Sequence, residues 1–247
     1  MAYCGCFVPT VLFLTSRARR KSTSARVHPT GKTEQLLGGE ATEAAFREAA
    51  THHAYVHVAT HGFFAPPRPA STPQASNGSP ALNLGAAGWH PGVLSGIVLA
   101  GANAGRSAET DDGVLTALEL APLDLRHADL LVLSACETGL GASAGGEGLL
   151  GLQRAAQVGG VRTVVASLWQ VDDRVAQAFL GRFYENLWTK NLPRLEAFRQ
   201  AQLAFIRGEL AQGGVARGPG KTTKRKAKTY RAPEESWAAW TLSGNWR

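Results

Sequence analysis

Short apolar runs alternate with segments of helical pattern along most of the chain, and no other feature of the sequence constrains the fold as strongly. Each run has the length of a strand, and a helical segment or a turn separates it from the next. Such an alternation is typical of α/β folds, so we predict a mostly parallel sheet with helices on both faces. The predicted strands are "AYVHVAT" (54–60), "SGIVLAG" (95–101), "ADLLVLSA" (128–135), "VRTVVASLW" (161–169) and "SWAAWTL" (236–242).

Five segments carry the periodicity or the end signals of helices. The second of them is short and ends before Pro122, because the residue before a proline disfavours helical geometry. The third is closed by a pair of glycines, 159 and 160. The predicted helices lie within 41–54, 112–125, 146–160, 174–187 and 193–211, the last with Pro193 at its first position.

The chain has 247 residues and is 44% hydrophobic, which is enough for one substantial core. Residues 1–33 show no periodicity, and we predict a disordered basic tail there. All the predicted strands and helices fall within 34–247, which forms one predicted α/β domain. Two segments of that domain, 65–80 and 213–231, have the composition of loops and are predicted to be flexible insertions.

The net charge of +7 comes from two segments rather than from the whole chain. Residues 1–33 carry six Lys/Arg and residues 213–231 carry seven, with no acid in either segment. This leaves 13 of the 26 basic residues against all 19 acidic ones for the rest of the chain. Such basic segments could bind nucleic acid, but aromatic residues do not interleave with the basic ones. We therefore expect solvated segments and no nucleic-acid partner.

Cysteine usage and apolar runs indicate the compartment. The three cysteines, Cys4, Cys6 and Cys136, form no disulfide framework, which favours a reducing environment. The longest apolar run, 4–15, is shorter than the roughly 18 residues of a membrane span. Basic residues follow that run rather than precede it, which is the reverse of a secretory signal. We therefore expect a cytoplasmic protein without a membrane association.

A histidine and a cysteine stand where two predicted strands stop. His61-Gly62 closes the strand in "VHVATHGFF" (56–64), and Cys136 closes the strand in "LLVLSACETGLG" (130–141). Ligands of open α/β sheets bind at the carboxyl ends of the strands, so the two side chains could face each other there. A free cysteine has a pKa of about 8.5, and a nearby histidine can take its proton to create a nucleophile. The backbone N–H groups of Gly62 and Cys136 could then stabilise an oxyanion.

Each of these residues also has a structural interpretation. A lone cysteine at a strand end is usually a small buried hydrophobic residue, and a lone histidine usually bonds a neighbouring carbonyl. His57 shares the strand parity of His61, and we interpret it as structural. His53, His57 and His61 recur at every fourth residue, a spacing that would suit a metal ion on a helix. The valine-rich segment favours a strand instead, so we predict no metal site.

Seven stretches of the chain together resemble the CHAT domain family. They occur in the order of the family's motifs, and the resemblance covers roughly residues 36–247. The stretches are "HVATHGFF", "SGIVLAG", "DGVLTALEL", "LVLSACETGLG", "GEGLLGLQRA", "VRTVVASLWQVDD" and "SWAAWTLSGNWR".

This family is similar to caspases and separases, which are cysteine endopeptidases. The resemblance implies a caspase-like three-layer sandwich, with His61 as general base, Cys136 as nucleophile, and Gly62 with Cys136 as the oxyanion hole. It also implies a protein substrate, a role in bacterial signalling or defence, and no cofactor. Because family members often follow tetratricopeptide repeats, a tetratricopeptide-repeat region or protein is the expected regulatory partner.

The resemblance leaves a second function open. Family members usually carry further strands upstream, whereas a basic tail precedes the predicted domain here. The chain could therefore be a fragment or begin at a misassigned start, and its sheet could lack an edge. The alternative to a peptidase is a catalytically silent interaction module on the same fold, and the intact pair of His61 and Cys136 favours the peptidase.

The stretch "SLWQVDD" (167–173) follows the strand after the nucleophile and could reach the same cleft. Its counterpart in separases helps to form the pocket for a basic side chain. Here Trp169 could form an apolar wall, and Asp172 or Asp173 could lie at the floor of a substrate pocket. The structural alternative is that one of the two aspartates caps the following helix.

Overall fold

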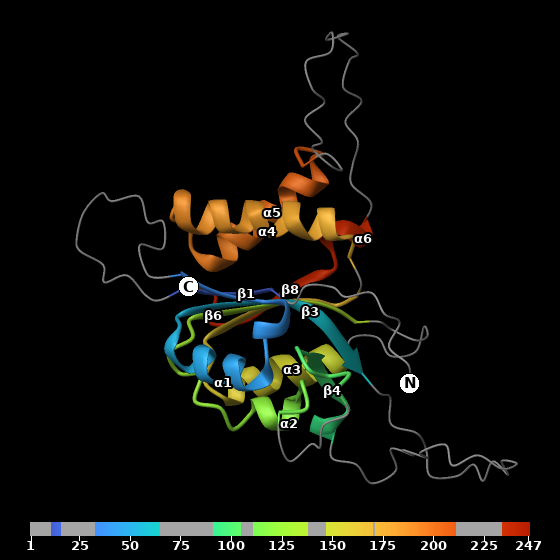
Figure 1. Ribbon diagram of the computed structural model, residues 1–247. Helices are drawn as coiled ribbons and strands as arrows, with labels where there is room; N and C mark the ends of the chain where they lie inside the picture. Colours follow the sequence, from blue (N-terminus) through green and yellow to red (C-terminus); the bar gives the residue numbers. More distant parts are fainter. Residues whose placement is uncertain are drawn as a thin grey trace, which may run out of the picture.

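The computed structural model describes residues 11–15, 33–64, 91–104, 111–137, 147–169, 171–210 and 234–247. Figure 1 shows a sheet between two helical layers, with α1, α2 and α3 on one face and α4, α5 and α6 on the other. The prediction of helices on both faces is therefore confirmed. The helices are α1 (Glu43–His52), α2 (Ala117–Leu120), α3 (Glu147–Val158), α4 (Asp173–Tyr184), α5 (Arg194–Ile206) and α6 (Glu234–Trp237).

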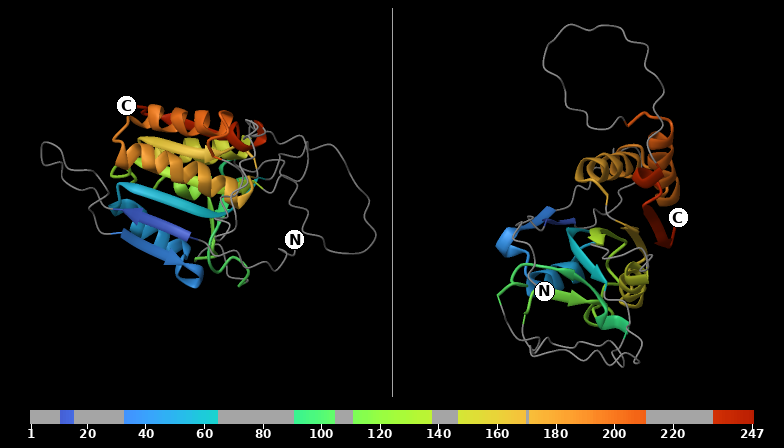
Figure 2. Two further views of the ribbon diagram at one scale, coloured as in Figure 1. Left: turned by 90° about the horizontal axis from the view of Figure 1, so that it is seen from above. Right: turned by 90° about the vertical axis from the view of Figure 1, so that its right-hand side faces the viewer.

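The sheet has the strand order β2-β1-β3-β6-β7-β8, and β4 pairs with β3 and with β5 beside this path. Seen from above, α4 and α5 lie over one side of the sheet, and β1 and β2 lie beside them (Figure 2). The strands are β1 (Val11–Thr15), β2 (Thr33–Leu37), β3 (Tyr55–Phe64), β4 (Ser95–Val98), β5 (Val114–Thr116), β6 (Leu130–Glu137), β7 (Thr163–Ser167) and β8 (Trp240–Gly244).

The prediction of a mostly parallel sheet is wrong. Of the seven pairings between these strands, two are parallel, β3 with β6 and β6 with β7. The connections explain the difference. A single helix, α3, leads from β6 to β7 and returns the chain in the same direction, whereas α4, α5 and α6 all lie between β7 and β8, which pair antiparallel. The sheet is mixed, with a parallel centre and antiparallel flanks.

The prediction of a disordered tail is wrong for residues 11–15, which form β1. This strand pairs antiparallel with β2 on one side and with β3 on the other. The apolar run "VLFLT" is therefore explained by a place inside the sheet, not by a terminus. The sheet has β2 at this edge, which corrects the expectation of a missing edge. The predicted insertions at 65–80 and 213–231 lie outside the described residues.

Alternation along the central strands gives the sheet two apolar faces. Val58 and Leu133 belong to the core beneath α1, α2 and α3. Val132 belongs to the core beneath α4 and α5, where Phe179 stacks on Trp240 with ring centroids 4.9 Å apart. Because successive residues of a strand point to opposite faces, the two cores fix which face each strand position takes.

The helices occur where the sequence predicts them, with small differences at their ends. The hydroxyl of Thr42 caps α1 by accepting from the N–H of Ala45, and α2 ends before Pro122. Pro193 is the N-cap of α5 rather than its first residue, so this helix begins one residue later than predicted. A π-helix over Glu185–Thr189 continues α4, and short 3₁₀ turns lie at Gly38–Glu40 and Pro91–Val93.

Three strand predictions need correction. β3 continues to Phe64, four residues beyond the predicted end, because β4 folds back along it. β5 lies in a segment predicted to contain a helix alone. The final strand begins at Trp240, because the preceding residues form the short helix α6. Within the described residues, no helix is both long and apolar enough to cross a membrane.

Candidate active site

The parallel pairing of β3 and β6 brings the two predicted catalytic positions together. His61 and Cys136 are direct partners in the register, and Gly62 is the partner of Glu137. Neighbouring strands lie about 4.8 Å apart, so the two backbone positions are as close as two strands allow. His61 does not end its strand as predicted, because β3 runs on to Phe64.

Both positions also lie on one face of the sheet. His61 has the parity of His57 along β3, and Cys136 has the parity of Val132 along β6. Val132 contributes to the core beneath α4 and α5, which identifies the face. The register therefore places a histidine and a cysteine at adjacent positions of one face, at the carboxyl ends of parallel strands.

His61 belongs to a row of paired residues that crosses four strands. The row runs from Cys136 on β6 through His61 on β3 and Val98 on β4 to Val114 on β5. The hydroxyl of Thr60 donates to the carbonyl of Val98, which ties β4 to β3 at this level. The backbone of His61 is therefore held from both sides, and its position does not depend on a loop.

His57 and His61 share a strand and a face but differ in their surroundings. His61 is exposed, whereas His57 is partly buried, with its Nδ1 3.1 Å from the hydroxyl of Tyr184. Burial lowers the pKa of His57 to about 4 and raises the pKa of Tyr184 above its usual value. His57 is thus neutral at physiological pH and packed against an aromatic ring, which confirms its structural interpretation.

The predicted pocket residues take three separate positions after β7. Trp169 is 39% exposed, and its Nε1 donates to the carbonyl of Glu235 over 3.0 Å, which ties this segment to α6. Asp172 is the N-cap of α4, because its carboxylate accepts from the N–H of Arg174 over 2.9 Å. The capping alternative is confirmed for Asp172, while Asp173 is an exposed residue in the first turn of the helix.

The histidines at every fourth position do not gather into one cluster. His53 lies before β3 at the end of α1, where its Nδ1 is 2.7 Å from the carbonyl of Ala49 and its Nε2 is 3.6 Å from a carboxylate oxygen of Glu34. Among the described residues, no group of three or more His, Cys, Asp or Glu side chains is arranged to hold a metal ion.

Two features of the site have no signal in the sequence. Tyr184 lies 127 positions from His57, and its contact with the histidine depends on how α4 crosses the sheet. Val98 flanks His61 only because β4 turns back antiparallel beside β3, and Val114 on β5 lies one strand further out. Gly62, predicted to contribute an N–H group, is buried within β3 between Ile97 and Glu137.

Comparison with known proteins adds one finding. The model of the CHAT domain family matches residues 12–245 of the chain. This match begins within β1, so it includes a strand that lies outside the predicted domain boundary at residue 34. A search of curated proteins finds no significant match.

Proposed function

The chain belongs to the CHAT domain family, and on that premise we propose that it is a cysteine endopeptidase with His61 as general base and Cys136 as nucleophile. The family is related to caspase-like peptidases, and the central strand order of this sheet is compatible with a caspase-like sandwich. The observation that carries the proposal is the direct pairing of His61 with Cys136 at the carboxyl ends of two parallel strands.

The proposed reaction begins with proton transfer from the thiol of Cys136 to the imidazole of His61. The thiolate attacks the carbonyl carbon of the peptide bond, and the carbonyl oxygen becomes an oxyanion. His61 then gives its proton to the leaving amine as the C–N bond breaks. Water, deprotonated by His61, attacks the resulting thioester and releases the second product and the thiol.

The proposed oxyanion hole uses the backbone N–H groups of Gly62 and Cys136. Gly62 has no side chain to obstruct a substrate carbonyl, and its pairing with Glu137 is the last that the structure describes between β3 and β6. Donors fixed in a strand need no reorganisation as negative charge develops, which makes them effective at lowering the barrier.

His61 is a better candidate for the base than His57. The pKa of His57, at about 4, makes it a weak proton acceptor, and its ring is packed against Tyr184. His61 is exposed and therefore open to a substrate. His57 and His61 share residue type, strand and face, so only their different surroundings assign them different roles.

For substrate choice, we propose that Trp169 walls the pocket and that Asp173 supplies its negative charge. Asp172 uses a carboxylate oxygen to cap α4, whereas Asp173 is exposed one position further along. A pocket of this kind favours a long basic or apolar residue before the cut over an acidic one. A peptide-library cleavage profile tests this, and strong preference for aspartate before the cut would contradict it.

The biological setting is proposed from the family. We propose a protein substrate, a regulatory tetratricopeptide-repeat region or protein, a cytoplasmic location and a role in bacterial signalling or defence. Each of these is independent of the chemistry at His61 and Cys136, and each needs its own experiment.

A thiol-reactive peptide probe tests the dyad directly. The protein carries Cys4→Ser and Cys6→Ser, so that labelling reports on Cys136 alone, and it is compared with the same protein carrying His61→Ala or His57→Ala. We expect rapid labelling that falls strongly in the His61 variant and is retained in the His57 variant. Labelling that is equal in all folded variants would contradict the dyad. A folded protein without any labelling would favour the catalytically silent interaction module.

A further inference from the structure

The amino terminus of α1 carries a buried carboxylate, Glu43, and one of its two oxygens accepts no hydrogen bond from the described residues. Glu43 is 3% exposed. Its Oε1 accepts from both Nε and Nη2 of Arg47, the former over 2.9 Å. Its Oε2 is buried and has no hydrogen-bond partner among the described residues. A buried anionic oxygen without a donor among the described side chains is costly, which favours a ligand or a proton on this group.

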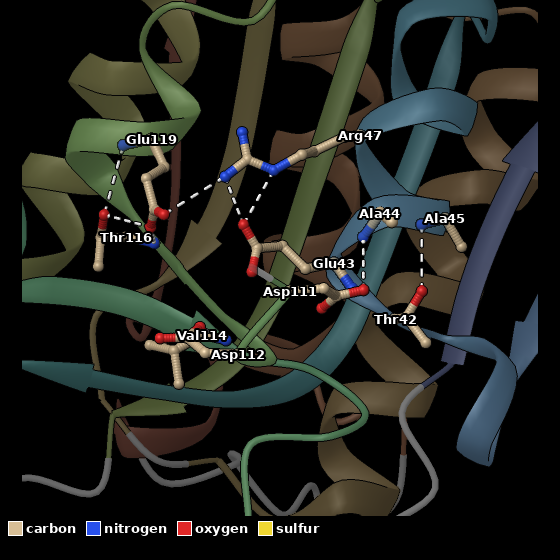
Figure 3. A network of polar contacts seen from close by, with 10 residues as sticks. All are labelled: Thr42, Glu43, Ala44, Ala45, Arg47, Asp111, Asp112, Val114, Thr116 and Glu119. Atoms are coloured by element: carbon tan, nitrogen blue, oxygen red, sulfur yellow. Dashed lines mark hydrogen bonds and ion pairs between the residues drawn. The ribbon is translucent and has the colours of Figure 1, made fainter. Parts of the chain in front are cut away.

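The surroundings of Glu43 hold more acid than base. Figure 3 shows Glu43 between Arg47 on the same helix and Asp111 on the segment that leads into β5. The carboxylates of Asp112, before β5, and of Glu119, on α2, both act on Glu43 and raise its pKa, although desolvation by burial is the largest cause. Arg47 opposes them through a hydrogen bond and its charge, but it is shared with Glu119 over 3.4 Å.

Asp111 and Asp112 connect the start of α1 to the start of β5. Asp111 accepts from the N–H of Glu43 over 3.3 Å and from that of Ala44 over 3.2 Å. Asp112 accepts from the N–H of Val114 over 2.8 Å, and Val114 is the outer member of the row that contains His61. A change of charge at Glu43 therefore acts on the junction between α1, β5 and α2.

We propose that Glu43 is a proton-binding site, and that one proton on Oε2 strengthens the attachment of α1 to the segment leading into β5. The proton converts an unsolvated anionic oxygen into a neutral O–H group, and it removes the repulsion between Glu43 and the carboxylates of Asp112 and Glu119. A metal ion is a poorer ligand for this position, because the described acidic side chains do not form a coordinating group. This inference does not depend on the proposed peptidase activity.

The sign of the pH effect follows from linkage. The folded state binds the Glu43 proton more tightly than the unfolded chain does, for which the ordinary pKa is 4.5. The stabilisation is therefore complete below pH 4.5 and is lost as the pH rises through the higher pKa of the folded state. Other carboxylates titrate in the opposite sense, so the effect of Glu43 must be isolated by comparison.

A carboxyl NMR titration of the full chain tests proton binding in the wild-type protein. We expect Glu43 to titrate above its ordinary pKa of 4.5, and we expect Asp112→Asn to lower the midpoint of Glu43 by removing a negative charge. A midpoint for Glu43 at or below 4.5, or no shift in the Asp112 variant, would overturn the proposal.

Urea unfolding across pH tests the effect on stability. In Glu43→Gln the amide is neutral at every pH, so the ratio of the wild-type unfolding constant to that of the variant should rise above pH 4.5. The rise is up to about tenfold for each unit by which the folded-state pKa is raised. The control, Glu48→Gln, should show a constant ratio. A constant ratio for Glu43→Gln as well would overturn the proposal, and if that variant does not fold, the NMR titration decides.

Discussion

The two halves of β3 place the same residue type in opposite surroundings. His57, in the first half, lies against Tyr184, which stacks on Trp188 with ring centroids 4.4 Å apart. His61, in the second half, is exposed, and within the sheet it pairs with β4. The strand, the face and the side chain are shared, so the difference comes from what packs above each position. One half of the strand is covered by aromatic side chains, and the other half carries an exposed histidine.

The aromatic cover over the first half has an identifiable origin. Tyr184 ends α4, and the π-helix that follows carries Trp188 back over β3, where the tryptophan meets Tyr55 edge-on at 5.9 Å. The wider turn of a π-helix changes the direction of the side chains relative to a continued α-helix. The cover therefore ends before it reaches His61, and the two halves can be tested separately.

The largest expected effect comes from removing the nucleophile in the open half. Cys136→Ala should abolish peptidase activity while the free energy of unfolding changes little, because little volume is lost. Activity on a protein or peptide substrate and urea unfolding of the same preparation measure the two quantities. Cys4→Ser is the matched control and should retain activity. Cleavage by the Cys136 variant at the wild-type rate would show that the open half does not carry the reaction.

The second effect compares the two histidines directly. His61→Ala should lower the rate by about 10²–10⁴-fold, the usual cost of losing a positioned acid–base group. His57→Ala should instead lower stability, because it removes a partly buried ring and its contact with Tyr184. Rates and unfolding free energies of both variants are measured together. Equal losses of rate at equal stability would show that the two halves are not functionally distinct.

The third effect is a pH dependence that belongs to the covered half alone. The folded-state pKa of His57 is about 4, below its ordinary value of 6.5. As the pH falls from 6.5 to 4, the unfolded chain takes up this proton before the folded protein does, so stability is present above 6.5 and is lost across this window. The loss should be about 2–3 kcal/mol. Unfolding of His57→Phe at several pH values should lack this component, whereas His61→Phe should keep it.

The smallest expected effect is a loss of stability at α4, the helix whose last residue, Tyr184, covers the first half of β3. Asp172 caps the beginning of α4 on the side of Trp169, and Tyr184 ends the same helix over His57. Asp172→Ala should cost about 1 kcal/mol, the usual value for a lost N-cap. Asp172→Ser, which can still cap, should recover most of it. Urea unfolding measures both, and a loss that Ser does not recover would indicate that the aspartate acts through something other than the cap.

The sequence predicts local structure and the meeting of His61 with Cys136 because both depend on short-range patterns. An apolar run leads up to His61, and another leads up to Cys136. The carboxyl ends of neighbouring parallel strands meet at one edge of a sheet, which brings the two residues together. Helix positions follow from breakers, such as Pro122 after α2 and the glycine pair 159–160 after α3. These signals need no knowledge of the rest of the chain.

Strand direction and long-range contacts could not be predicted from such signals. The antiparallel return of β8 follows three helices, α4, α5 and α6, and the apolar run that forms β1 cannot be told by its composition from an apolar terminal segment. The contact between His57 and Tyr184 spans 127 positions. Glu43 has the sequence position of an ordinary first-turn acid, and its burial, with Glu119 and Asp112 nearby, makes it unusual.

The place of β1 inside the sheet has a practical consequence for shortened versions of the protein. A chain cut to begin after β2 would lose Val11–Thr15 and Thr33–Leu37 together. The outer edge of β3 over residues 55–59, now paired with β1, would then expose unpaired N–H and C=O groups on a straight strand. Such an edge pairs readily with a second molecule, so the truncated protein should aggregate or form strand-linked dimers even though both helical layers and both proposed catalytic residues are retained.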